Sequence, residues 1–144
     1  KMSDEDLGWW VGRDLRDLEE QRRASLAICR TFSPQLLFLT RGAQGVLACL
    51  ERRGEVSVIE RDAEPARVFA DTVGAGDTFM GAVLSTLDEL VLRDAFFDGW
   101  NALRIDYALR FGSVAASMNC ERDGCDPPTK AEVKARLAEL EEGS

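Results

Sequence analysis

The segment "ADTVGAGDTF", residues 70–79, contains the residue types that could support phosphoryl transfer. Gly74 and Gly76 have no side chain, so the backbone around them can turn tightly and approach a ligand closely. The apolar run that follows predicts a helix that begins near Gly76 or Asp77, and the first N–H groups of a helix have no helical acceptor. Those groups and the helix dipole favour an anion. The backbone of Gly74, Ala75 and Gly76 is therefore predicted to form an anion hole.

Asp77 stands at the start of this predicted helix, although a phosphate bound there would repel its carboxylate. Its position is reasonable if it faces a neutral hydroxyl that loses a proton while attacking the phosphoryl group. In phosphoryl transfer a positioned carboxylate commonly accepts that proton, while backbone donors and a metal stabilise the charge. A plain glycine turn before a helix capped by Asp77 or Thr78 is the alternative, and these residues alone leave it open.

Other nucleotide motifs are absent from the sequence. No G-x-x-x-x-G-K-[ST] phosphate loop occurs, and a G-x-G-x-x-G pattern fails because Phe79 stands at its last position. Histidine is also absent, which excludes a Ser-His or Cys-His nucleophile and a histidine base within this chain. A base in this sequence is therefore expected to be a carboxylate, with a Lys, Tyr or Cys as the less favoured alternative.

Composition and charge restrict the class of protein. The 144 residues are 45% hydrophobic and 31% charged, which is typical of one globular domain. The net charge of -8 argues against general nucleic-acid binding. No apolar stretch is long enough to span a membrane and no signal peptide is visible. The first residue is Lys1 and the opening residues resemble the interior of a folded unit, so we expect a piece of a longer chain.

The cysteines indicate a reducing compartment. No C-x-x-C pair occurs, which disfavours a zinc site, and an acidic chain without a leader favours reduced thiols in the cytoplasm. The cysteines are Cys29, Cys49, Cys120 and Cys125.

Helices and strands are expected to follow one another along the chain, which favours a layered α/β architecture. Apolar spacing and breakers predict helices over residues 3–12, 13–32, 76–90, 101–118 and 129–142. Short apolar runs predict strands over residues 35–40, 46–51, 55–60 and 66–70. The second and third of these strands should form a hairpin. The last should lead into a glycine loop, "TVGAG" at residues 72–76.

The string "DTVGAGDTF" resembles the C-terminal signature of the ribokinase-like (PfkB-type) carbohydrate kinases. Three further segments occur in the family's order. "KMSDED" resembles the K-x-N-x-x-E segment that helps to place magnesium and phosphates. "TRGAQG" resembles the T-x-G-x-x-G turn beside the nucleotide phosphates, and "ERDGCDPPT" resembles the tail that closes the nucleotide pocket. The resemblance covers nearly the whole chain.

The resemblance implies a role for each matching residue. Asp77 would be the general base, and Gly74, Ala75 and Gly76, with the Asp77 N–H, would hold the transferred phosphoryl group. The residues implied to contact ATP are Thr40, Gly42, Gly45, Ser113, Gly124 and Cys125. The residues implied to hold cations are Asp71 and the Val73 carbonyl for potassium, and Asp6 for magnesium.

The sequence departs from the family's pattern at Ser3, where Asn is usual, and at Asp6, where Glu is usual. Asp6 is one methylene shorter than Glu, and an acid at a helix start is its alternative reading. Thr40 could simply end a strand, and Asp71 could be a cap or turn residue. Ser113 stands where many members carry an Asn near the adenine.

Residues 1–144 therefore resemble the C-terminal, nucleotide-binding part of one ribokinase-like domain. The implied fold is the C-terminal portion of a layered α/β fold, a central sheet flanked by helices, without the lid and the N-terminal half. The implied partners are ATP, a small sugar and the missing N-terminal half, with a homodimer left open. Neither nucleic acid nor membrane is an expected partner.

The implied activity is an ATP-dependent sugar kinase that phosphorylates a primary hydroxyl with Mg²⁺ and K⁺, and a fructokinase is favoured. Ketodeoxygluconate kinase and ribokinase are the alternatives within the family. A non-catalytic kinase-like binding or regulatory module is the alternative from another class. A plain α/β fragment with a capped glycine turn is the third.

Overall fold

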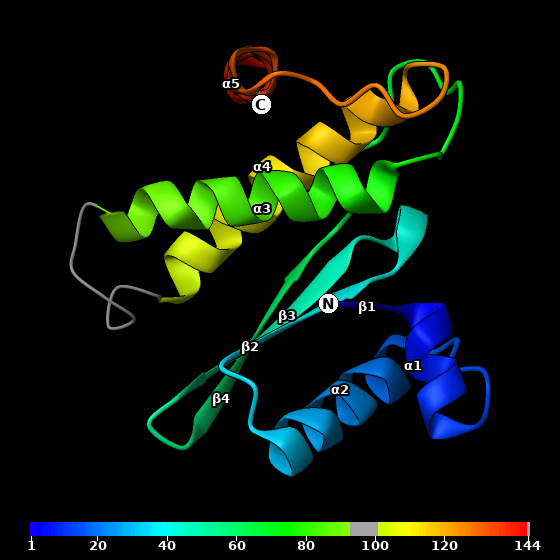
Figure 1. Cartoon of the computed structure of the whole chain (residues 1–144), viewed down its shortest axis with the longest axis vertical. Helices are drawn as coiled ribbons and strands as arrows, with labels where there is room; N and C mark the ends of the chain where they lie inside the picture. Colours follow the sequence, from blue (N-terminus) through cyan, green and yellow to red (C-terminus); the bar gives the residue numbers. More distant parts are fainter. Residues whose placement is uncertain (93–100, 144) are drawn as a thin grey trace. The chain divides into compact units, whose positions relative to one another are not determined.

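A mixed sheet and two helices form the first of two folded units, residues 1–62, in a computed structural model that describes residues 1–92 and 101–143. The strands lie in the order in which they occur along the chain (Figure 1). They are β1 (Met2–Ser3), β2 (Leu36–Thr40), β3 (Val46–Arg52) and β4 (Glu55–Arg61). β1 runs parallel to β2, and the other pairs are antiparallel. The three predicted strands over residues 35–60 are confirmed, whereas β1 was not predicted.

Helix α1 (Asp4–Val11) confirms the helix expected at the start of the chain. Its N-terminus carries a capping box, because the Ser3 hydroxyl accepts from the Asp6 amide and the Asp6 carboxylate accepts from the Ser3 amide. Gly12 ends the helix in the left-handed region at φ +80°. A glycine adopts this conformation without the steric cost that a Cβ brings.

Helix α2 (Leu18–Phe32) begins five residues later than predicted. The Asp17 carboxylate accepts hydrogen bonds from the Glu19 and Glu20 amides at 2.7 and 3.1 Å, which makes Asp17 the N-cap. The predicted helix over 13–32 is therefore wrong in its first turn, because this cap starts the helix at residue 18.

The hydrophobic core of the first unit lies between α1, α2 and one face of the sheet. Leu37 and Leu39 alternate along β2, and Leu47 and Cys49 face the same cluster from β3, as expected for a strand buried on one side. The helices contribute Leu7, Ile28 and Cys29. Burial raises the pKa of the Cys49 thiol to about 12. The Cys49 thiol therefore packs in the core and does not act as a nucleophile.

The second unit is residues 63–144, and its described residues form three helices: α3 (Ala75–Leu92), α4 (Ala102–Cys120) and α5 (Lys130–Glu142). α3 and α4 cross at close range (Figure 1). Gly112 permits this crossing, because a Cβ there would lie 2.6 Å from Val83 Cγ2 and 3.0 Å from Phe79 Cδ2. The α4–α5 core contains Phe111, Val114, Ala115, Met118, Val133 and Leu137. None of the helices in the described ranges is long and apolar enough to cross a membrane.

The strand predicted over residues 66–70 does not form. The Ala70 and Asp71 amides both donate to the Cys120 carbonyl, at 2.8 and 3.3 Å, and the Arg67 amide donates to Glu121 Oε1 at 2.8 Å. The end of α4 thus takes the hydrogen bonds that a neighbouring strand would need. This leaves the segment as an irregular connection, bent at residues 67 and 68, that leads to the glycine loop.

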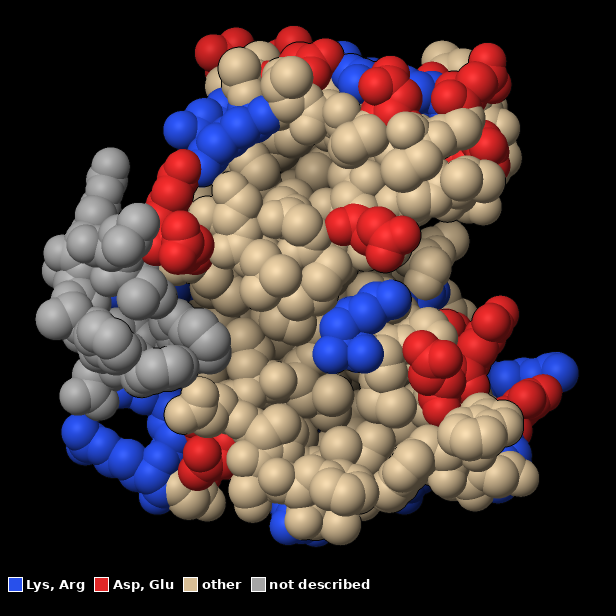
Figure 2. Space-filling model, viewed as in Figure 1, with Lys and Arg blue, Asp and Glu red and all other residues tan. Residues whose placement is uncertain are grey.

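Ion pairs connect α5 to the elements around it. Arg136 binds Glu121 through two hydrogen bonds of 2.9 and 2.8 Å, and both side chains are largely buried. Figure 2 shows acidic and basic side chains next to one another over this helix. The hydrogen bonds from Arg136, more than any other cause, lower the pKa of Glu121 to about 2. This pair anchors the segment that follows α4.

Candidate functional site

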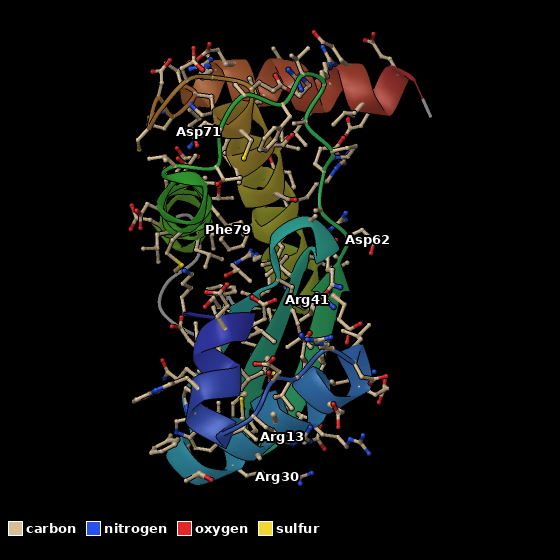
Figure 3. The ribbon with its side chains drawn as sticks, turned by 90° about the vertical axis from the view of Figure 1, so that its right-hand side faces the viewer. Arg13, Arg30, Arg41, Asp62, Asp71 and Phe79 are labelled. Atoms are coloured by element: carbon tan, nitrogen blue, oxygen red, sulfur yellow. The ribbon has the colours of Figure 1, made fainter. Side chains whose placement is uncertain are left out.

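Asp71 connects the glycine loop to the segment after α4. Its Oδ1 accepts from the Val73 amide at 3.0 Å, an Asx turn, and its Oδ2 accepts from the Gly124 amide at 3.3 Å. Figure 3 shows Asp71 on the loop before α3, beside the segment that follows α4. The structure thus gives Asp71 a turn role. Each carboxylate oxygen has a further lone pair, so the donor type also suits a cation.

Gly74 is required for two separate reasons. Its φ is +76°, a conformation that side-chain-bearing residues rarely adopt. A Cβ at this position would also lie 2.2 Å from Cys125 Sγ and 2.9 Å from Cys125 Cβ. The loop and the segment after α4 therefore pack against each other without any space for a methyl group.

The N-terminus of α3 supplies two amides that could bind an anion. The helix begins at Ala75, slightly earlier than predicted, and the Thr78 amide donates to the Gly74 carbonyl at 2.8 Å. The Ala75 amide donates to the carbonyl three residues earlier, at 3.1 Å. The Gly76 and Asp77 amides remain, because their position in the first turn gives them no helical acceptor. An anion at this end of α3 would also meet the positive end of the helix dipole.

The Asp77 carboxylate lies exposed in the first turn of α3. Within residues 1–92 and 101–143 it takes part in no ion pair or side-chain hydrogen bond. A carboxylate without a competing partner is free to accept a proton from a ligand.

A cleft of about 380 Å³ begins at Asp77 and Thr78 and extends between the helices of the second unit. Its size lies in the range of small-molecule sites, and its walls are mostly small or apolar. The other lining residues are Gly81, Ala82, Ser85, Phe111, Ala115, Cys125, Pro127, Pro128, Lys130 and Val133. The ammonium group of Lys130 pairs with Glu89.

The "ERDGCDPPT" segment meets this cleft in part. Cys125 lines it together with Pro127 and Pro128, whereas Gly124 lies beside it and donates to Asp71. Ser113 is not among the residues that line the cleft. Its hydroxyl accepts from the Glu64 amide at 3.0 Å, on the connection that follows β4. The predicted contact of Ser113 with an adenine therefore has no support from the cleft.

The "TRGAQG" segment forms the tight turn between β2 and β3. Gly42 and Gly45 both have positive φ, +53° and +92°, and the Arg41 amide donates to the Gly45 carbonyl at 2.9 Å. Thr40 is the last residue of β2, and its hydroxyl contacts the Met2 carbonyl at 3.4 Å. The turn explains both glycines. Gly42 is exposed, so its backbone could face a ligand, whereas Gly45 is buried.

Asp6 takes part in the capping box of α1, as its alternative reading anticipated. Hydrogen bonds from the backbone and then the side chain of Ser3 lower the pKa of its carboxyl. No group of three or more acidic, cysteine or histidine side chains in the described residues could hold a metal ion. A magnesium ion held by one carboxylate and by substrate phosphates remains compatible with Asp6.

Two residues of note were missed from the sequence. Arg41 is only 6% exposed, and its Nε has no hydrogen-bond partner in the described part of the chain. Together with Arg16 and Arg61 it lines a cleft of about 410 Å³. The sequence feature that could have identified Arg41 is a cationic residue inside a glycine turn of an acidic chain. Asn119 is fully buried, and its amide contacts Val73 and Thr78. A lone amide side chain in the last turn of an apolar helix was its signal.

A family model described as "pfkB family carbohydrate kinase" matches residues 1–132. Among curated proteins, "Probable fructokinase-4" of Arabidopsis thaliana is 31% identical over 142 residues. That match covers 95% of this chain and 38% of the plant protein.

Solved structures share the fold at low identity. A ribokinase from Giardia lamblia superposes with a TM-score of 0.81 at 22% identity, covering 96% of this chain and 42% of that protein. Phosphofructokinase-2 from Escherichia coli in complex with potassium gives a TM-score of 0.73 at 22% identity, covering 98% and 41%. The chain therefore spans about two fifths of the length of the relatives that it matches.

Proposed function

We propose a function for this chain on the premise that it belongs to the pfkB family of carbohydrate kinases, as the match over residues 1–132 shows. The mixed α/β fold and its structural neighbours agree with this membership. We propose that residues 1–144 are the nucleotide-binding part of a kinase that transfers the γ-phosphoryl group of ATP to a hydroxyl of a small sugar.

The observation that carries the proposal is the first turn of α3. It offers an unpartnered carboxylate at Asp77 next to the amides of Gly76 and Asp77, which have no helical acceptor. A base and an anion hole are thus held on one rigid element. This pairing suits the transfer of a phosphoryl group to a hydroxyl better than it suits anion binding alone, since a carboxylate opposes the binding of an anion.

The reaction proceeds by in-line displacement. The sugar hydroxyl oxygen forms a bond with the γ-phosphorus while the bond from that phosphorus to the bridging oxygen breaks, and ADP leaves. Asp77 accepts the proton of the attacking hydroxyl. The Gly76 and Asp77 amides donate to the oxygens of the phosphoryl group in transit. No covalent enzyme intermediate is needed.

Two cations are proposed to assist. Magnesium would neutralise charge on the phosphates. Asp6 is the residue of this chain proposed to help hold it, because it stands where the family's K-x-N-x-x-E segment carries its Glu. Asp71 and the Val73 carbonyl would hold potassium, an ion present in the complex of the Escherichia coli neighbour. Both residues precede the anion hole directly in the chain, so a cation held by them would steady its backbone.

Each unit carries residues that are proposed to contact the nucleotide. The adenosine would occupy the cleft lined by Cys125 and the two prolines, beside Gly124. A contact of the adenine with Ser113 is proposed from the resemblance alone, since Ser113 does not line the cleft. The T-x-G-x-x-G turn, with Thr40, Gly42 and Gly45, would lie along the phosphates. The size and apolar walls of the cleft support the first part, and the exposed position of Gly42 in its turn supports the second.

We favour fructose as the acceptor, because the curated relative at 31% identity carries the name of a fructokinase. Ribose and ketodeoxygluconate remain the alternatives. The proposal includes a homodimer as one assembly of the whole protein.

A non-catalytic regulatory module is the second candidate, and the capping role of Asp6 favours it. Asp6 caps α1 with both its amide and its carboxylate, so its presence is explained without magnesium. The free Asp77 carboxylate argues against this candidate, since it has no structural partner in the described residues.

The deciding test measures ADP release by the longest natural form of the protein with ATP, Mg²⁺ and fructose, ribose or ketodeoxygluconate. Asp77→Asn is expected to lower kcat about 10²–10⁴-fold, the usual contribution of a general base. Asp88→Asn, on an exposed position of the same helix, is the matched control and should keep full activity. Turnover that survives in Asp77→Asn would refute the assigned base, and ATP binding without turnover on any sugar would favour the regulatory module.

A further inference from the structure

The side-chain amide of Asn119 bridges the two ends of the proposed anion hole. Its Nδ2 donates to the Val73 carbonyl at 2.8 Å, and its Oδ1 accepts from the Thr78 hydroxyl at 3.2 Å. Between Val73 and Thr78 lie the four residues 74–77 that carry the glycines and the proposed base. We infer that Asn119 is a positioning residue, which holds this segment in its reactive geometry; the inference rests on the proposed kinase function.

Chemistry fixes the orientation of this amide. The Val73 carbonyl can only accept, so the Asn119 atom that faces it must be the NH₂ group. The oxygen of Asn119 then faces the Thr78 hydroxyl, which must donate. The NH₂ group and the oxygen of Asn119 each bind one end of the segment, and a flipped amide could not form both hydrogen bonds.

Burial makes the two hydrogen bonds effective. Asn119 is 0% exposed, so water does not compete for its amide, and a hydrogen bond in such surroundings is stronger than at the surface. Asn119 lies in the last turn of α4, a helix packed against both α3 and α5. The segment is thus tied to a rigid helix and does not depend on its own turn alone.

The Val73 carbonyl has a second consequence for the cation. One of its lone pairs is taken by Asn119, which aims the other lone pair in a defined direction. If potassium binds at Asp71 and Val73, loss of the Asn119 amide should weaken potassium activation as well as turnover. A residue that merely contributed to stability would not change the potassium requirement.

The first test compares Asn119→Leu, which keeps the size and removes both hydrogen bonds, with Asn119→Asp, which keeps only the acceptor for Thr78. We expect kcat to fall about 10–100-fold in both, because small displacements of a reacting group have effects of this order. The KM for ATP should stay within about threefold, and half-maximal activation should need several-fold more potassium.

Ser117→Ala is the matched control. Ser117 lies two residues earlier on α4, is also buried, and its hydroxyl has no hydrogen-bond partner in the described residues. This variant should leave kcat and the potassium requirement unchanged. Equal kinetics for Asn119→Leu and Ser117→Ala would overturn the inference.

Hydrogen exchange gives a readout that does not need kinase activity. In Asn119→Leu, amides of the peptide that covers residues 73–80 should exchange about tenfold faster or more, while peptides from β2 and β3 should not change. Unchanged exchange over residues 73–80 would refute the positioning role even if the wild-type protein proved to be no kinase. Conversely, faster exchange in a protein without turnover would preserve the inference about Asn119 and reject the proposed function.

If Asn119→Leu fails to fold, Thr78 supplies a second route. Thr78→Val removes the donor to Asn119 with little change in volume, and Thr78→Ser retains the hydroxyl. Faster exchange over residues 73–80 in Thr78→Val, and wild-type exchange in Thr78→Ser, are expected. The same exchange in both variants would overturn the inference.

Discussion

At the scale of single residues, backbone conformation and packing both restrict the glycine loop. Gly74 has a left-handed backbone and no room for a Cβ beside Cys125. Asp71 and Asn119 bind the amide and the carbonyl of Val73, the residue just before it. The Asp77 carboxylate has no hydrogen-bond or ion-pair partner within the described parts of the chain. The chain thus constrains the loop strongly and leaves the proposed base free, as a site that binds a ligand requires.

Gly74→Ala should therefore lower the free energy of unfolding by more than the positive φ alone would. We expect a loss of about 2–4 kcal/mol in the free energy of unfolding, from backbone strain and from the contact with Cys125. Thermal or urea unfolding measures this loss. Gly54→Ala is the control, because Gly54 has φ +85° and a methyl group there would meet nothing within 4 Å. It should cost only about 1 kcal/mol, and an equal loss in both variants would contradict the packing argument.

At the scale of elements, two ion pairs connect the end of α4 and the segment after it to α5: Glu121 with Arg136, and Arg122 with Glu132. Glu121 accepts two hydrogen bonds from Arg136 and one from the Arg67 amide, so it joins α4, α5 and the connection before the glycine loop. This carboxylate is thus the point at which three segments around the proposed site meet.

Glu121→Gln should lower stability at neutral pH by about 2 kcal/mol, the usual range for a hydrogen bond to a charged group. The folded pKa of about 2 lies below the ordinary value of 4.5, so the wild-type contribution is present above pH 4.5. It is lost as the pH falls from 4.5 toward 2. Urea unfolding as a function of pH should show the two proteins converging at the acid end.

Glu142→Gln, at an exposed position in the last turn of α5, is the control for this experiment and should change stability by less than about 0.5 kcal/mol. A difference between wild type and Glu121→Gln that stayed constant from pH 7 to pH 2 would contradict the role of the charged pair.

At the scale of the whole molecule, the two units carry different residues that are proposed to contact the nucleotide. The glycine turn after β2 belongs to the first unit, and the cleft beside α3 belongs to the second. ATP is expected to bind the folded protein, so it should stabilise the protein against unfolding by an amount that depends on its concentration.

ATP with Mg²⁺ at 100 times its Kd should raise the free energy of unfolding by about 2.7 kcal/mol. Ser85→Trp should abolish this gain, because Ser85 lines the cleft and a tryptophan would fill it. Leu84→Trp is the control, since Leu84 is 54% exposed and is not among the residues that line the cleft. Thermal unfolding with and without ATP measures the effect. An undiminished gain in Ser85→Trp would place the nucleotide elsewhere.

Local signals in the sequence predicted most elements correctly. The acidic start of the first helix after Ser3, the glycine turn after β2 and the apolar periodicity of the helices were sufficient for α1, α4, α5 and the β3–β4 hairpin. The strand over residues 66–70 was wrong because its backbone partner is the Cys120 carbonyl, about fifty residues away in the chain. β1 was missed because two residues give no pattern.

The sequence by itself determined the family, because the "DTVGAGDTF" string places its glycines and its acid at fixed spacing within one loop and one helix start. The tertiary structure decided which of those groups are free. It engaged Asp71, Asp6 and the Ala75 amide in local hydrogen bonds, left Asp77 unpartnered among the described residues, and brought Asn119 against both ends of the loop. The Asn119 contacts join residues far apart in the chain, and only the packing of α4 against α3 creates them.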